Sequence, residues 1–222
     1  MQKNKLLTSL LAICVVIFVI TFSIGLPIYF RPFYYMQIDS LGIEEETGYT
    51  KEEIKQGYDE ILDFLTLPGK EYGTGVFESS EEGESHFADC KRLFTLNLVL
   101  LITSFVGMVT LIVLNKLKKF TLCRPFGKHF LYTCGSGTLI FFAFLGGLCA
   151  LNFDKAFEVF HAIFFPGKEN WMFNPWEDEI ILAMPQEFFM RCGILIGASI
   201  ILTSIAFIIY GIIDKRKREN SK

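Results

Sequence analysis

The sequence predicts an all-α membrane protein with four transmembrane helices and two outward-facing segments that carry short amphipathic helices. Three observations favour this class. Hydrophobic residues make up 51% of the 222 residues, and charged residues only 20%. The apolar residues gather in runs of about 20, roughly the length that a helix needs to cross a bilayer. Basic and acidic residues alternate between the connections that separate these runs. A soluble enzyme, a disordered chain and a disulfide scaffold are thereby excluded.

The apolar runs define a single membrane domain over residues 1–222. The spans are expected at residues 6–26, 93–114, 130–151 and 188–213. The first span follows basic residues, as the apolar part of a signal peptide does, but it is longer and no A-x-A cleavage motif follows it. We therefore expect an uncleaved anchor.

Charge distribution predicts the orientation. Lys3 and Lys5 precede the first span, loop 115–129 carries five bases and no acid, and the C-terminal tail carries five bases against two acids. Segment 27–92 carries fifteen acids against six bases, and segment 152–187 seven acids against two bases. The positive-inside rule then predicts that both termini and loop 115–129 are cytoplasmic. The two acidic segments are expected outside.

The first outer segment contains a predicted amphipathic helix near residues 51–67. Thr50 followed by Glu53 is typical of a capping box, and Pro68-Gly69 ends the pattern. One helical face is apolar, with Ile54, Tyr58, Ile61, Leu62 and Leu65. Such a helix either packs to stabilise the segment or covers a cavity between the spans.

Two of the three histidines are the main candidates for chemistry. His129 lies in the basic loop, where solvent or lipid headgroups are the expected surroundings. His86 precedes the second span, and on a continuous helix it shares a face with Asp89 and Cys90. His161 lies in a short aromatic helix of the second outer segment. Because histidine titrates near neutral pH, such a pair can accept and return a proton in one catalytic cycle.

Three charged residues are candidates to support this pair. Asp89 near His86, and Glu158 three residues before His161, could fix a tautomer or hold an imidazolium. Arg191 lies one turn into the fourth span. It either extends to the membrane interface or lines a polar cavity, where it would stabilise developing negative charge.

Other chemistries are less well supported by the motifs. The six cysteines form no C-x-x-C pair, and neither G-x-S-x-G nor H-E-x-x-H occurs. A Cys90–His86 nucleophilic pair, a Cys90–Cys192 disulfide, and a metal site built from His86, Asp89 and His161 remain open, although the last matches no strong ligand spacing.

Two stretches carry a resemblance to a known family. Residues 79–91 (SSEEGESHFADCK) and 160–175 (FHAIFFPGKENWMFNP), with Pro185 and Phe188-Phe189 before the fourth span, resemble the bacterial lipoprotein intramolecular transacylases. These are four-span membrane proteins, and the likeness covers the whole chain. The sequence departs from the family at Cys90, where a small aliphatic residue is usual, which argues against Cys90 as a nucleophile.

The resemblance implies a reaction, a site and a location. In a lipoprotein whose N-terminal Cys bears a diacylglyceryl group, the sn-2 acyl chain moves to the α-amino group and leaves a lyso-form lipoprotein. His86 and His161 are then the catalytic acid/base pair. Supporting or substrate-binding residues are Asp89, Glu158, Asn170, Trp171 and Arg191. No metal or cofactor is implied. The expected partners are diacylglyceryl-modified lipoproteins and membrane lipid, with no nucleic acid, at the outer face of the bacterial cytoplasmic membrane.

The implied reaction needs no more than these residues supply. Conversion of an ester to an amide requires no energy source, and attack within one molecule gains from proximity. The alternative function is a non-enzymatic four-span scaffold or lipid-binding protein with merely interfacial histidines. A transporter is less favoured, since the spans hold almost no charge. A zinc-dependent hydrolase would require a bound metal.

Overall fold

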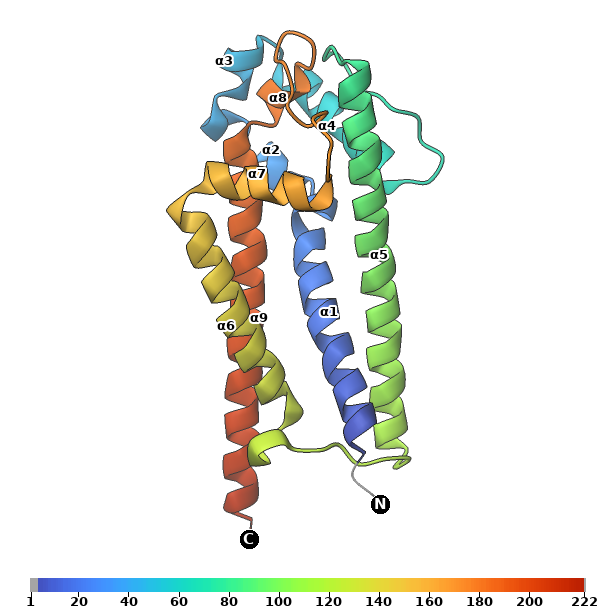
Figure 1. The fold of residues 1–222 in the computed structure, drawn as a ribbon, viewed down its shortest axis with the longest axis vertical. Coiled ribbons are helices and arrows are strands. Elements are labelled where there is room, and N and C mark those ends of the chain that lie inside the picture. The colour runs from blue at the N-terminus through green and yellow to red at the C-terminus, as the bar shows by residue number, and fades with distance from the viewer. Residues whose placement is uncertain (1–3, 222) are drawn as a thin grey trace. The chain divides into compact units, whose positions relative to one another are not determined.

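The computed structural model describes residues 4–221, in which the regular structure is helical (Figure 1). Lys3 and Lys222, two of the basic residues in the orientation argument, lie outside the described residues. The elements in chain order are α1 (Lys5–Tyr29), α2 (Pro32–Tyr35), η1 (Asp39–Leu41), α3 (Ile43–Thr47), α4 (Lys51–Thr66), α5 (Glu81–Lys116), η2 (Pro125–Gly127), α6 (Phe130–Leu151), α7 (Phe153–Phe164), α8 (Ile180–Ala183) and α9 (Gln186–Glu219).

The chain divides into two compact units. The bundle unit comprises Met1–Ile24, Leu98–Ala150 and Ile196–Lys222, and the head unit comprises Gly25–Asn97 and Leu151–Leu195. Each unit is therefore assembled from segments that are far apart in the sequence.

Four helices, α1, α5, α6 and α9, are long and apolar enough to cross a membrane, and each contains one of the predicted spans. The predicted all-α membrane class is confirmed. With 36 residues, α5 is about 54 Å long at a rise of ~1.5 Å per residue, well beyond the ~30 Å of a hydrocarbon core. The surplus lies at its N-terminal end, where acidic residues and His86 precede the apolar span.

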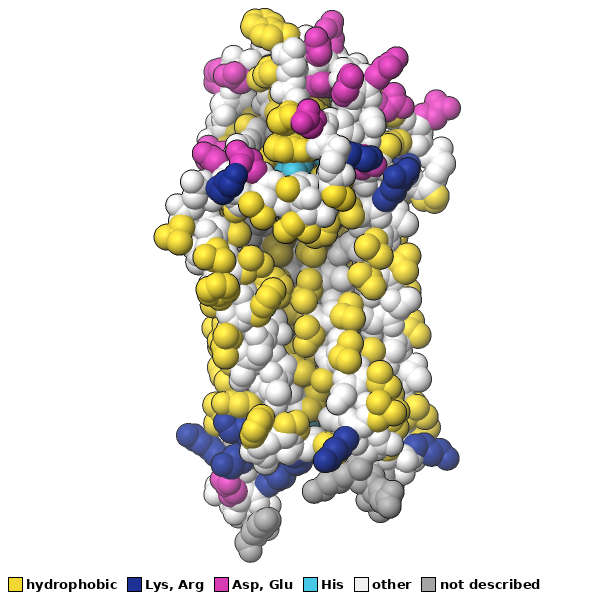
Figure 2. Space-filling model, viewed as in Figure 1, with side chains coloured by type: hydrophobic (Ala, Val, Ile, Leu, Met, Phe, Trp, Pro, Cys, Tyr) yellow, Lys and Arg dark blue, Asp and Glu magenta, His cyan; other side chains and the backbone are white. Residues whose placement is uncertain are grey.

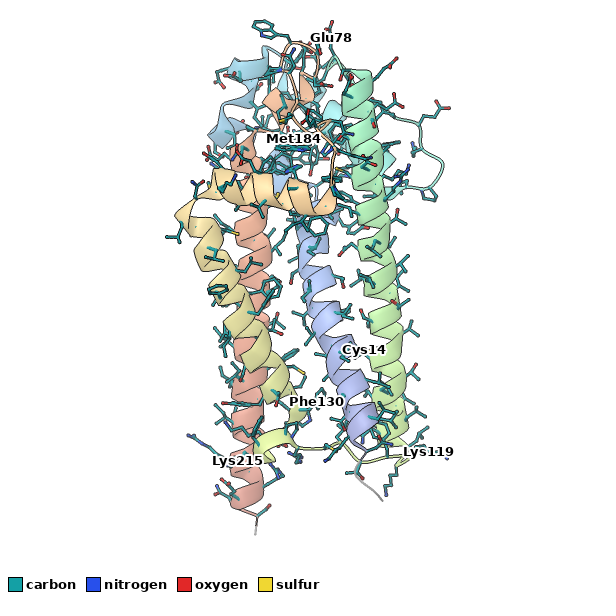
Figure 3. The ribbon with its side chains drawn as sticks, viewed as in Figure 1. Cys14, Glu78, Lys119, Phe130, Met184 and Lys215 are labelled. Carbon is teal, nitrogen blue, oxygen red and sulfur yellow. The ribbon has the colours of Figure 1, made fainter. Side chains whose placement is uncertain are left out.

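The bundle unit is held by small residues and an apolar interior. Leu11, Val15, Phe130 and Cys134 form its buried cluster, in which Figure 3 labels Phe130. At Gly135 of α6 an added methyl carbon would lie only 2.5 Å from a backbone oxygen of α9, so the two helices approach closely there. A groove of about 520 Å³ with a mainly apolar lining runs between residues of α1 and α6. Figure 2 shows basic side chains gathered at the helix ends of this unit.

The head unit is built around α4. The predicted capping box is confirmed: the Thr50 hydroxyl accepts from the Glu53 amide at 3.4 Å, and the Glu53 carboxylate accepts from the Thr50 amide at 2.9 Å. The whole predicted apolar face is buried. Tyr58 of α4 stacks on Tyr34 of α2 with ring centroids 3.8 Å apart, and the Tyr34 hydroxyl donates to Ala183 O of α8 at 2.8 Å. Of the two readings of this helix, the structure supports the packing helix.

Two acidic side chains join the start of α5 to α8. Asp178 is 3% exposed and accepts from the Ser80 amide at 2.8 Å and from its hydroxyl at 2.9 Å. Glu179 accepts from the Tyr49 hydroxyl at 2.9 Å and from the Glu78 amide at 3.0 Å. The N-terminal turns of α5, and with them His86, are thus fixed to the head core.

The head packing generates a stability prediction at Gly57 of α4. A methyl carbon added there would lie 2.5 Å from the Phe77 ring and 2.7 Å from Thr74 O. Gly57→Ala should therefore lower the free energy of unfolding by about 1–3 kcal/mol through overpacking, measured as a lower Tm in detergent. Gly146→Ala on α6, where nothing lies within 4 Å of the added carbon, is the control. An unchanged Tm for Gly57→Ala would contradict the packing described.

Candidate active site

His86 lies on the second turn of α5 and is almost fully enclosed by aromatic side chains. It is 7% exposed, and its ring meets Phe165 at 5.0 Å and Phe173 at 5.4 Å between centroids, both edge-on. Among the described residues its Nε2 faces the Cys90 sulfur at 3.4 Å, and its Nδ1 is buried with no hydrogen-bond partner. One nitrogen of the ring is therefore committed to a protein contact and the other is not.

His161 lies on α7 and is equally buried, at 6% exposure. The helix begins at the Asn152 cap, whose side chain accepts from the Lys155 amide at 2.9 Å. His161 Nδ1 lies 2.8 Å from Phe157 O. Because a carbonyl oxygen only accepts, Nδ1 carries the hydrogen, and the neutral ring keeps a lone pair on Nε2. Trp171 stacks on this ring at 4.4 Å and 24°.

The two histidines are brought together, as the sequence predicts. Their ring centroids are 5.8 Å apart. Two cations at this separation in a buried place would repel strongly, which favours states with at most one charged imidazole. Burial lowers the pKa of His161 below its usual value, partly offset by the hydrogen bond to Phe157 O, which holds the ring in place. At neutral pH His161 is a free base able to take up a proton.

In the described part of the chain, Asp89 makes no hydrogen bond to either histidine, and its carboxylate instead anchors the loop that carries Trp171 and Phe173. Its carboxylate pairs with the Lys168 ammonium, lies 3.4 Å from Asn170 Nδ2 and 3.3 Å from the Arg92 guanidinium. The side chain of Asp89 is only 10% exposed, so this is a partly buried ion pair. It ties the segment that carries Trp171 to α5.

The sequence reasoning missed Lys168 and the two phenylalanines that close on His86. Asp89 and Lys168 are 79 residues apart in the chain, and no local spacing connects them. Phe165 and Phe173 lie in an aromatic-rich stretch that indicates a membrane interface as readily as a binding pocket. Only the loop's turn after Pro166, with Gly167 at φ +72°, indicates that the chain reverses there.

Two other predicted site residues, Glu158 and Arg191, make ion pairs away from the two histidines. Glu158 pairs with Lys155 at 2.7 Å, and the atom that receives His161 Nδ1–H is the backbone oxygen of Phe157. Arg191 pairs with Glu187 at 2.6 Å and donates to Ser40 Oγ at 2.7 Å, so it joins α9 to η1.

The structure bears on two alternatives that the sequence left open, the Cys90–Cys192 disulfide and the metal site. Both Cys90 and Cys192 are free, so the disulfide that their location allowed is not formed. Among the residues that the structure describes, no group of three or more His, Cys, Asp or Glu side chains could hold a metal ion. The three-ligand hypothesis fails because the Asp89 carboxylate is taken by Lys168 and Arg92.

A small pocket lies beside this loop. Its volume is about 230 Å³, and Asn170 and Phe173 line it together with acidic side chains that include Glu82 and Asp178. Asn170 reaches from this pocket to the Asp89 anchor, and its Oδ1 is buried without a partner among the described residues.

Chemically, the site offers two neutral imidazoles in an aromatic enclosure, which suits proton transfer and polarisation of a carbonyl group.

Comparisons with known proteins identify the family of the chain. The family model described as lipoprotein intramolecular transacylase Lit matches residues 9–189. The solved structure of the membrane-integral lipoprotein intramolecular transacylase Lit from Bacillus cereus is similar with a TM-score of 0.85 and 29% identity, covering 97% of each chain.

Two solved variants of that protein, with one histidine replaced by arginine or by alanine, are each similar with a TM-score of 0.78 and 28% identity. They cover 97% of this chain and 94% and 95% of their own. The comparison with curated proteins finds no match. The described part of this chain has four helices long and apolar enough to span a membrane. Because the family model matches residues 9–189 and the structural likeness covers 97% of the chain, the chain belongs to the lipoprotein intramolecular transacylases, a family of integral membrane enzymes.

Proposed function

We propose that this enzyme moves the sn-2 acyl chain of a diacylglyceryl-modified lipoprotein to the α-amino group of the same N-terminal Cys, with His86 and His161 as the catalytic pair and at least one of them acting as acid and base. The observation that carries the proposal is the pairing of two buried imidazoles 5.8 Å apart under an aromatic loop. No separate nucleophile is needed, because the substrate's own amine attacks.

The proton inventory of the reaction matches this pair. The neutral amine attacks the ester carbonyl carbon, the C–N bond forms, and a base takes the amine proton. The C–O bond then breaks, and the leaving glyceryl oxygen takes a proton. Because His161 Nδ1–H is bonded to Phe157 O, the lone pair on His161 Nε2 is available to take the amine proton. One of the two imidazoles returns the proton, so the enzyme ends unchanged.

We further propose that the head unit faces outward and both termini are cytoplasmic. Supporting this orientation, the connections that belong to the head unit are acidic, whereas loop 115–129 and the C-terminal tail are basic. This topology would present the site to lipoproteins and membrane lipid on the outer face. Figure 2 shows acidic side chains gathered on the surface of the head unit.

Replacing either histidine tests the proposal. His86→Gln and His161→Gln should each lower conversion of diacylglyceryl-Cys to N-acyl, S-monoacylglyceryl-Cys by about 10²–10⁴-fold, the typical loss of a general acid or base or of a donor to the developing oxyanion. The measurement is mass spectrometry of a reporter lipoprotein's N-terminal peptide.

His129→Gln is the matched control for that experiment, since His129 packs against Phe130 and Tyr210 in the bundle unit. It should convert the reporter normally. If both test variants convert normally, the enzyme acts through other residues. If the wild-type chain converts nothing, the scaffold or lipid-binding alternative takes its place.

The lowered pKa of His161 predicts the pH profile. A substrate amine has a pKa of about 8, so kcat/KM should rise with pH until the amine is neutral. A further loss should appear only below pH ~6.5, where His161 itself becomes protonated and can no longer accept a proton. Initial rates between about pH 5 and 9 check this. A decline as pH rises through ~7 would mean that a protonated imidazole is required instead.

The loop anchor gives a separate prediction. Lys168→Gln removes the partner of the partly buried Asp89 carboxylate and should lower conversion by about tenfold or more, because the loop that carries Trp171 loses its tether. Lys155→Gln is the control, since its pair with Glu158 is solvent-exposed and worth little. Equal activity of the two variants would refute the anchoring role.

A further inference from the structure

We infer that Cys90 is a positioning residue, whose thiol holds His86 in the tautomer that presents an Nδ1–H donor to the substrate. The inference deepens the proposed function and rests on it. Its starting point is geometric: Cys90 follows His86 by four residues on α5, and its sulfur lies 3.4 Å from His86 Nε2, within the range of a hydrogen bond to sulfur.

The direction of this hydrogen bond follows from the chemistry of the two groups. A thiol sulfur is a weak acceptor, whereas an unprotonated imidazole nitrogen is a strong one. The stronger pairing therefore has the Cys90 S–H donating to His86 Nε2. In a neutral ring only one nitrogen bears hydrogen, so the hydrogen of His86 lies on Nδ1.

His86 Nδ1 is the nitrogen that has no hydrogen-bond partner among the described residues. It belongs to a side chain that is 7% exposed, where water cannot readily satisfy it. A buried N–H without an acceptor is costly, and the ester carbonyl of a bound substrate is an acceptor of the right kind. During attack this oxygen gains negative charge, and a donor already aimed at it stabilises that charge.

The two histidines are then held in opposite roles by different local contacts. Phe157 O fixes hydrogen on His161 Nδ1 and leaves Nε2 as the base. Cys90 fixes a lone pair on His86 Nε2 and leaves Nδ1–H as the donor. His161 takes the amine proton and later returns it to the glyceryl oxygen. His86 gives a hydrogen bond without losing its proton, so every proton is accounted for.

Charged neighbours of His86 do not replace the thiol in this role. The groups that face it electrostatically are His161 from α7, Asp89 from its own helix and Lys168 from the loop. Asp89 is engaged by Lys168 and Arg92. None of these three is hydrogen-bonded to a ring nitrogen of His86 in the part of the chain that the structure describes.

The experiment measures the tautomer directly. Full-length protein in detergent, with its histidines labelled with nitrogen-15 in both ring positions, is studied by NMR at neutral pH. The His86 signals are assigned with His86→Gln. Wild type should show a protonated Nδ1 and an unprotonated Nε2, and Cys90→Ser, which keeps a donor, should show the same.

Cys90→Ala and Cys90→Val should instead show a mixture of both tautomers, and kcat should fall about tenfold with KM little changed. Cys192→Ala is the control, because Cys192 is another free, half-buried thiol packed against the head core. It should leave the His86 tautomer as in wild type.

The inference is overturned if wild type carries hydrogen on Nε2, or if Cys90→Ala and Cys90→Val keep the wild-type tautomer. A wild-type spectrum with hydrogen on Nε2 overturns the inference even where a variant fails to fold. The proposed function fails in a different way, namely when wild type does not convert the reporter lipoprotein, whatever the tautomer is.

Discussion

The ion pair between Asp89 and Lys168 is the interaction on which the candidate site depends. It joins the first turns of α5 to the loop after α7, two segments that the chain brings together across 79 residues. That loop carries the ring that stacks on His161 and the ring that closes on His86. This anchor holds Trp171 and Phe173 against the histidines together with the hydrogen bonds from Ser80 to Asp178, further along the same loop. The partly buried carboxylate is satisfied at the same time by Asn170, so the anchor also fixes a polar side chain beside the site.

The aromatic enclosure explains why the histidines are suited to proton transfer. A solvated imidazole would be partly charged near neutral pH, and a charged one cannot accept a proton. Burial in the head unit holds the pKa of His161 low, while the backbone oxygen of Phe157 keeps the ring oriented. The apolar burial of the head core, in which Tyr34 and Tyr58 stack, offsets the cost of burying two polar rings in the same unit. The fold therefore maintains a reactive but uncharged pair.

The sequence could predict whatever is encoded by local patterns. Length of apolar runs identifies the spans, and the Thr50–Glu53 spacing identifies the α4 cap, because both depend on residues within a few turns. The shared face of His86 and Cys90 follows from helical periodicity in the same way. What could not be predicted depends on contacts over long sequence distances. The pairing of Asp89 with Lys168 is one such contact. The partner of His161 Nδ1 is another case, because it is the backbone oxygen of Phe157, which no side-chain pattern reveals, and Glu158 pairs with Lys155 instead.

Intramolecular transfer sets modest demands on such a site. In the proposed reaction the amine and the ester belong to one lipidated cysteine, so the enzyme does not have to bring two molecules together, and holding the two groups in register supplies much of the rate. What remains is to keep the amine neutral, to steady the charge on the carbonyl oxygen and to return one proton. The proposed base, His161 with a free Nε2, and the proposed donor, His86 with a fixed Nδ1–H, are sufficient for these tasks. Two imidazoles that are neutral at rest in a buried aromatic enclosure avoid the resting charges that a buried ionised acid and base would place there.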